Sequence, residues 1–124
     1  MKTIIAGTRT FNDYELLKTK LTKFRLTHDI TEIVSGGAKG ADRLGERYAE
    51  EYNITIKIFP ANWNKHGNAA GPIRNRQMAE YADQLIVFWD GSSKGTNNMI
   101  DSMDKQKKPM YMVLYGLINK GVAD

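Results

Sequence analysis

The segment Glu32–Asp42, EIVSGGAKGAD, constrains the fold of this 124-residue chain more than any other. A short apolar run enters a turn that is almost free of side chains, and beyond Asp42 apolar residues recur four positions apart, as on a helix face. A strand, a glycine turn and a helix in this order expose N–H groups that can bind an anion, most often phosphate. The glycines could instead serve only a tight turn that needs positive φ.

The same alternation of strand and helix runs along the whole chain. Residues 85–89, LIVFW, are apolar throughout, which is typical of a central strand buried on both faces. Short connections between strands and helices predict an α/β fold with a parallel sheet, and a doubly wound strand order of 3-2-1-4-5. The five strands are predicted at residues 3–6, 32–35, 54–59, 85–89 and 110–114.

One connection is irregular. Residues 60–71, PANWNKHGNAAG, show no apolar periodicity and predict a long loop, with Pro72 at the start of a helix that continues from Ile73 to Ala82. Trp63 in this loop suits stacking on a base or a sugar, or alternatively it folds back over the core.

Ligands of doubly wound sheets bind at the carboxyl ends of the strands, where the strand order reverses. The turn that begins with Gly7 and the turn at residues 90–96 would face each other there, beside the glycine turn. Arg9 could pair with a phosphate or remain a solvated loop residue. The candidate ligand-binding residues are Gly7, Thr8, Arg9, Ser35, Gly36, Gly37, Ala38, Lys39, Gly40, Asp42, Trp63, Arg74, Asn75, Asp90, Gly91, Ser92, Ser93, Gly95 and Thr96.

The amino-acid composition limits the kinds of functional site and partner that the chain can have. The chain has no cysteine and two distant histidines, so thiolate catalysis is excluded and neither a metal site nor a cofactor is expected. The net charge of +4 suits a phosphorylated small molecule, whereas the scattered basic residues make nucleic acid a less favoured partner. No apolar run is long enough to cross a membrane, and no secretory signal is evident, so a cytoplasmic location without a membrane partner is expected.

Five motifs carry a family resemblance. GTR, SGGAKGAD, FPANW, GPIRNRQM and DQLIVFWDGSSKGT follow one another from about Lys2 to Val113 and resemble the YspA-type branch of the SLOG superfamily. The resemblance implies a single Rossmann-like domain over residues 1–124, with three α/β/α layers and five mainly parallel strands. It further implies binding of a nucleotide or a nucleotide-derived signal, such as an ADP-ribose-like molecule. A phage-type sensor or a sequestering protein in the bacterial host cytoplasm would use such a site.

The resemblance also implies two alternative functions. LOG-type phosphoribohydrolases of this superfamily cleave an N-glycosidic bond with an arginine and a glutamate. Arg74 falls where their arginine lies, but the glutamate position is Met99, and a thioether cannot act as a base. Asp90 could replace the glutamate, read a ribose hydroxyl or cap its own turn. The expectation therefore leans from enzyme towards binding; a DprA-like association with DNA is the second alternative.

LOG-type relatives are dimers or larger, so the resemblance implies a homo-oligomer. Met99 and Met103, with Tyr111 and Tyr115, could belong to an interface or to the core. The tail at residues 116–124 is expected to form a surface segment or to pack in the oligomer.

Overall fold

Five parallel strands form one sheet in the order β3-β2-β1-β4-β5, which confirms the predicted order. The structure is a computed structural model that describes residues 1–115, so the predicted tail at 116–124 lies outside the described residues. The elements are β1 (Lys2–Gly7), α1 (Tyr14–Phe24), β2 (Glu32–Ser35), α2 (Ala41–Glu51), β3 (Thr55–Ile58), α3 (Trp63–His66), the 3-10 helix η1 (Gly67–Ala69), α4 (Ala70–Tyr81), β4 (Gln84–Trp89), α5 (Lys94–Lys105) and β5 (Met110–Leu114).

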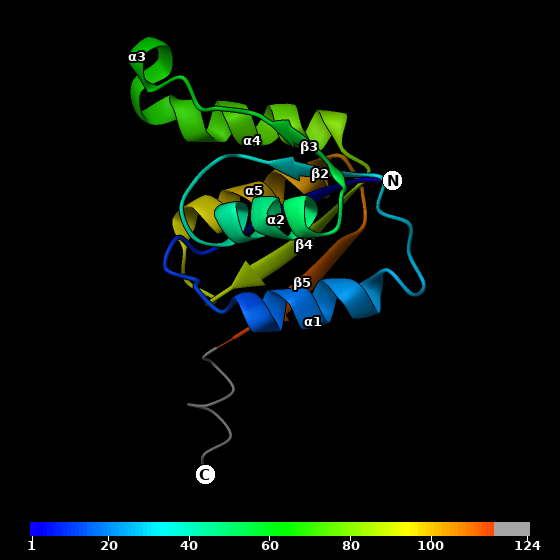
Figure 1. Ribbon diagram of the computed structural model, residues 1–124. Helices are drawn as coiled ribbons and strands as arrows, with labels where there is room; N and C mark the ends of the chain where they lie inside the picture. Colours follow the sequence, from blue (N-terminus) through cyan, green and yellow to red (C-terminus); the bar gives the residue numbers. More distant parts are fainter. Residues whose placement is uncertain (116–124) are drawn as a thin grey trace.

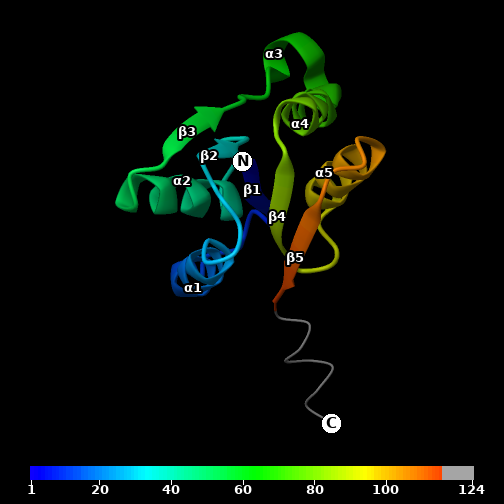
Figure 2. The same cartoon turned by 90° about the vertical axis from the view of Figure 1, so that its right-hand side faces the viewer.

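Each face of the sheet has its own core, because successive residues of a strand point to opposite sides. In β1, Ile5 packs on the side of α1 and α2, whereas Ile4 packs on the side of α4 and α5. Figure 2 shows these two helix pairs on either side of the sheet. Every residue of β4 except Trp89 is buried, as predicted for a central strand.

The methionines of α5 belong to the core. Met99 and Met103 are 2% and 0% exposed and pack with the α4 side of the sheet. Tyr111 and Tyr115 pack against the opposite core. Of the two alternatives for these side chains, the structure therefore shows the core, and they give no support to an interface. A homo-oligomer stays a prediction.

Local signals fix the helix ends and bring α2 close to the sheet. Asp13 caps α1 by accepting from the N–H of Leu16 at 3.0 Å, and Asn53 after α2 has a φ of 56°, as expected for a C′ residue. Within α2, a Cβ added at Gly45 would lie 2.8 Å from Cβ of Ile5. Glycine at this position therefore lets α2 lie directly on β1, which sets the position of the helix N-terminus.

The prediction of a long loop at residues 60–71 is wrong, because most of it is helical. The side chain of Asn62 accepts from the N–H of Lys65 at 3.1 Å and so caps α3, and Gly67, at φ 56°, ends it. The next helix, α4, begins at Ala70, two residues before Pro72. Proline is tolerated there because the N–H groups of a first turn have no partner within the helix. Figure 1 shows α3 projecting beyond the end of α4.

Within residues 1–115, none of the helices has the length and apolar character needed to cross a membrane.

Candidate ligand-binding site

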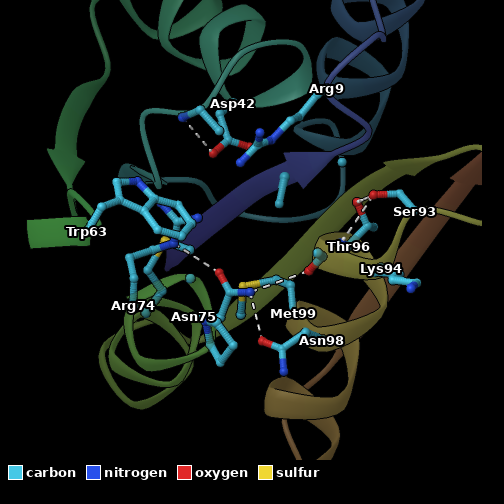
Figure 3. Close-up of a pocket in the computed structure, with 17 residues that line it drawn as sticks. Arg9, Asp42, Trp63, Arg74, Asn75, Ser93, Lys94, Thr96, Asn98 and Met99 are labelled. Carbon is cyan, nitrogen blue, oxygen red and sulfur yellow. Dashed lines mark hydrogen bonds between the residues drawn. The ribbon is translucent and has the colours of Figure 1, made fainter. Parts of the chain in front are cut away.

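A pocket of about 440 Å³ opens at the carboxyl ends of the strands, beside the point where β1 and β4 adjoin and the strand order reverses. We call it the switch-point pocket. Its lining includes Arg9, Asp42, Arg74, Asn75, Ser93 and Thr96. Figure 3 shows these side chains around the pocket; they come from the turn after β1, the first turn of α2, α4 and the N-terminal end of α5.

A neighbouring pocket of about 690 Å³, the outer pocket, lies between the glycine turn and the end of β3. It is lined by Gly36, Gly37, Lys39, Arg43, Glu46, Ile58, Pro60 and Ala61. Arg9, Ala38, Trp63 and Arg74 line both pockets. The two pockets are therefore adjoining parts of one groove at the carboxyl ends of the strands.

The glycine turn after β2 has internal acceptors for two of its N–H groups. Ala38 donates to Oδ2 of Asp42 at 3.2 Å, and Gly37 donates to Oγ of Ser35 at 3.0 Å. The Ser35 hydroxyl in turn donates to Glu46 at 2.6 Å. Because these N–H groups are engaged, the tight-turn alternative describes this part of the turn better than a phosphate cradle does.

Close approach to the neighbouring turn explains why glycine is needed. Gly40 has a φ of 79°, and a Cβ there would lie 2.3 Å from the carbonyl oxygen of Thr8. The turns after β1 and β2 are thus in direct contact, which brings Arg9 towards the pocket.

Asp42 is the carboxylate in the lining of the switch-point pocket. Its side chain is only 5% exposed, and burial raises its pKa to about 6. The N–H of Ala38 and the charge of Arg74 oppose this shift, while Glu46 adds to it. Asp42 therefore changes charge close to neutral pH.

Arg74 connects three elements. Its Nη1 donates to the carbonyl of Gly36 at 2.5 Å, and its Nε donates to Oδ1 of Asn75 at 3.0 Å. Asn75 then donates to Oδ1 of Asn98 on α5 at 2.9 Å. This chain of hydrogen bonds fixes α4 between the glycine turn and α5.

The charge of Arg74 is only partly compensated. Burial lowers its pKa, the Asp42 carboxylate raises it, and the positive charge of Arg9 lowers it further. Arginine remains protonated at neutral pH in spite of such shifts. The pocket thus holds two guanidinium groups close enough to repel one another, an arrangement that an anion between them would stabilise.

The N-terminus of α5 lines the same pocket. Ser93 caps the helix, because its Oγ accepts from the N–H of Thr96 at 3.5 Å and from its hydroxyl at 3.1 Å. The N–H groups of Lys94 and Gly95 precede the first carbonyl that could accept them within the helix. They carry the positive end of the helix dipole into the pocket lining. The Lys94 side chain itself points away from Trp63 and Arg74 in Figure 3.

The Asp90 side chain caps the turn in which it lies. Its Oδ1 accepts from the N–H groups of Ser92 at 2.9 Å and Ser93 at 3.1 Å, and these bonds lower its pKa, that from Ser92 most. Asp90 lines neither pocket. Of the alternatives for this residue, the structure shows the turn cap.

Trp63 lies at the rim of both pockets with 51% of its surface exposed, and it belongs to neither core. It therefore does not close over the core.

The structure brings most of the predicted residues together, but not all of them. The pockets are lined by Gly7, Arg9, Gly36, Gly37, Ala38, Lys39, Asp42, Trp63, Arg74, Asn75, Ser93, Gly95 and Thr96. The linings do not include Thr8, Ser35, Gly40, Asp90, Gly91 and Ser92, although Thr8 and Ser35 hold the turns by accepting from Asp90 and Gly37.

The linings also contain residues outside the predicted set: Ala6, Arg43, Glu46, Ile58, Pro60, Ala61, Gly71, Pro72, Met78, Lys94, Asn98 and Met99. Lys94 lies inside the predicted turn at residues 90–96, and Asn98 is one helical turn after it, so helical spacing could have identified both. Nothing in the sequence indicates that Ile58 lies beside a pocket, because its strand alternates as a half-buried strand does.

The fold and the position of the pockets define a doubly wound, Rossmann-like α/β protein with a groove at its switch point. More specifically, the chain belongs to the YspA, cpYpsA-related SLOG family, whose model matches residues 1–66.

A curated relative and a solved structure extend this result. The chain is 36% identical over 84 residues to the Gene 61 protein of Mycobacterium phage D29, covering 63% of this chain and 67% of the phage protein. The X-ray structure of DNA processing protein A (DprA) from Streptococcus pneumoniae matches with a TM-score of 0.70 and 14% identity, over 97% of this chain. This chain spans 56% of that structure's chain, and at this identity the likeness shows the fold alone.

Proposed function

We propose that this protein binds a nucleotide or a nucleotide-derived signalling molecule in the switch-point pocket. The observation that carries the proposal is the pair Arg9 and Arg74, which face the N-terminus of α5 across one pocket of about 440 Å³. Guanidinium groups and the first N–H groups of a helix are both preferred partners of phosphate. The phosphate would sit between them.

The remaining lining suits the rest of a nucleotide. Trp63 offers a half-exposed indole at the rim, which can stack on a base of any kind. Asp42 offers the carboxylate that can accept from a ribose hydroxyl, the role that the sequence also allows for Asp90. Asn98 adds an amide on the opposite wall. Each part of the ligand thus has a side chain of matching chemistry.

Binding is favoured over turnover by the side chain at the position of the LOG-type glutamate. Met99 is 2% exposed and lines the pocket, where it offers neither a base nor a negative charge. A protein of this kind would release its ligand unchanged. Together with the phage relative, this favours a sensor or a sequestering protein over an enzyme.

Phosphoribohydrolase activity is the second candidate, and one observation favours it. Asp42 lines the pocket with a pKa of about 6, and a carboxyl group that titrates near neutral pH can move a proton to or from a reacting group. It could deprotonate the water that attacks the sugar carbon, while the base leaves with the electron pair of the N-glycosidic bond.

Mass spectrometry of small molecules separates these functions. The protein would be incubated with nucleoside monophosphates, ADP-ribose, cyclic ADP-ribose isomers and cyclic dinucleotides, and then denatured. We expect one compound to be depleted from solution and to return intact. A free base with a ribose phosphate would establish the hydrolase instead. No change in any compound would contradict both candidates and favour the DprA-like DNA alternative.

Two variants show whether the switch-point pocket is responsible. Arg9 is exposed on the turn after β1, so Arg9→Gln should leave the fold intact and greatly reduce the depletion. Arg76 on α4 is also exposed but lines neither pocket, so Arg76→Gln removes the same charge elsewhere and should change nothing.

A further inference from the structure

The outer pocket is larger than the switch-point pocket and is continuous with it. Arg9, Trp63 and Arg74 line both, so a molecule bound at the N-terminus of α5 can extend past these side chains without leaving the groove. The outer pocket has about 690 Å³ of space beyond the part assigned to the phosphate and the first base. Its walls indicate what could occupy that space.

One wall of the outer pocket is apolar and exposed. Ile58, at the end of the edge strand β3, is 47% exposed, and Trp63 is 51% exposed. Pro60 and Ala61 lie between them in the sequence and also line the pocket. Covering such a wall with a flat aromatic ring would remove apolar surface from water, which is favourable.

Two cationic side chains, Lys39 and Arg43, line the same pocket and are exposed. Nε of Arg43 donates to the carbonyl of Gly37 at 3.2 Å, which anchors this arginine at the pocket. Among residues 1–115, the ion pairs within 4 Å involve neither of them. Glu46 is the carboxylate in this lining, and it accepts from Ser35 at 2.6 Å. The positive charges in the lining outnumber this negative charge, so a bound anion would be attracted.

The glycine turn between the pockets cannot hold that anion as a helix N-terminus would. The N–H groups of Gly37 and Ala38 already donate to Ser35 and Asp42. An anion in the outer pocket would instead be bound by the side chains of Lys39 and Arg43. An aromatic ring next to an anionic group is the composition of a nucleotide.

We propose that the outer pocket binds a second nucleotide unit, so that the ligand of this groove is a molecule of two nucleotides joined through phosphate. The second base lies against Ile58, Pro60 and Trp63, and its phosphate faces Lys39 and Arg43. The linking phosphate passes Arg9 and Arg74. This inference rests on the function proposed above for the switch-point pocket.

The test compares ligands of one and two units by calorimetry on the full chain. The probes are the four ribonucleoside 5′-monophosphates, 5′-phosphorylated dinucleotides with a 3′–5′ phosphodiester, and dinucleotides with a 5′–5′ pyrophosphate. We expect a two-unit probe to bind roughly tenfold more tightly, or better, than either of its monophosphates, because stacking of a second base and a second anion contact are added. Comparison of the phosphodiester with the pyrophosphate probes shows which of the two linkages the ligand of this groove contains.

Variants assign the gain to the outer pocket. Ile58→Thr keeps a β-branched residue on the strand, and Arg43→Gln removes the charge while keeping a side chain that can donate to Gly37. In both variants the two-unit probe should bind no more than about threefold more tightly than the monophosphate. Binding of the monophosphate itself should be unchanged. Arg76→Gln, outside both pockets, should retain the full advantage.

The outcomes separate this inference from the proposed function. If one unit binds as tightly as two, the second subsite is refuted while the function of the switch-point pocket stands. If none of the probes binds, the two-unit ligand is refuted, and the wider pool of the mass-spectrometry experiment decides whether the function of the switch-point pocket stands. If affinity continues to rise steeply from two units to an oligonucleotide of ten, the groove follows a nucleic acid strand, and the two-unit ligand is likewise refuted.

Discussion

Arg74 on α4 donates from Nη1 to the carbonyl oxygen of Gly36 at 2.5 Å, and this bond joins the α4 side of the protein to the turn after β2. A Cβ at Gly36 would lie 2.4 Å from Nη1 and 2.9 Å from Oδ2 of Asp42. The arginine thus occupies the space that a side chain at position 36 would need. Glycine at this position and the arginine 38 residues later form one structural unit.

The first prediction concerns this contact. Gly36→Ala should displace the Arg74 guanidinium, because the added Cβ meets the ends of the Arg74 and Asp42 side chains. The free energy of unfolding should fall by about 1–3 kcal/mol, the range for losing a hydrogen bond from a charged group such as that to Gly36. Nucleotide binding should weaken as well, because Arg74 leaves its place between the pockets. Urea unfolding and calorimetry measure the two effects. Gly95→Ala is the matched control: a Cβ there meets nothing within 4 Å. Its free energy of unfolding should stay the same or rise slightly.

The second prediction concerns Asn75, which is 6% exposed and bridges Arg74 to Asn98. Asn75→Ala leaves partly buried polar groups of Arg74 and Asn98 without this partner, so the free energy of unfolding should fall by about 1–2 kcal/mol. Thermal and urea unfolding would measure this loss. Asn97→Ala removes an exposed amide from the same helix as Asn98 and should change stability by no more than about 0.5 kcal/mol. Equal effects of the two substitutions would mean that the bridge contributes nothing.

The third prediction concerns the other end of α4. Nζ of Lys108 donates to the carbonyls of Ala79 and Ala82, at 2.8 Å each, and of Glu80 at 3.1 Å. These are the carbonyl groups that a helix leaves free at its C-terminus, where positive charge is favourable. Lys108→Met should therefore lower the free energy of unfolding by about 1–3 kcal/mol.

Lys105→Met is the control for Lys108→Met, because Lys105 is an exposed lysine in the last turn of α5. It should shift the urea midpoint little. A Lys108→Met variant that unfolds at the same urea concentration as the wild type would show that solvent replaces the ammonium group without loss.

Much of this fold could be predicted because it depends on local patterns. Short apolar runs, the longest of them in β4, and the alternation in β3 predicted every strand to within two residues at each end. The segment at 60–71 could not be predicted in the same way. Its short helix is fixed by the cap at Asn62 and by Gly67, and a four-residue helix is too short to show apolar periodicity.

The site could be predicted only in part. The end of the first strand identified Arg9, and the motif order of the resembling family identified Arg74. Neither signal showed that the Asp42 carboxylate would accept from Ala38 in the glycine turn or that Asp90 would cap its own turn. Both outcomes depend on which N–H group a carboxylate reaches, and that distance is set by the contact of two turns rather than by spacing along the chain.

The last prediction is a pH dependence that originates from Asp42. Its pKa is about 6 in the folded protein and 3.8 without structure, so between these values the folded state binds more protons than the unfolded state. The contribution of Asp42 to stability is therefore fully present below about pH 4 and is lost as the pH rises through 6. The loss amounts to about 3 kcal/mol, at 1.36 kcal/mol for each pKa unit.

Asp42→Asn removes this titration and keeps an oxygen that can accept from Ala38. Urea unfolding of both proteins at pH 4, 5, 6 and 7 would measure the difference in their free energies of unfolding. We expect this difference to shift in favour of the variant by about 2 kcal/mol between pH 4 and pH 6, and to stay constant above pH 7. The charged groups that act on Asp42, Arg74 and Glu46, are the same in both proteins. Parallel profiles would show that the Arg74 guanidinium and the N–H of Ala38 outweigh burial and keep the carboxylate ionised throughout this range.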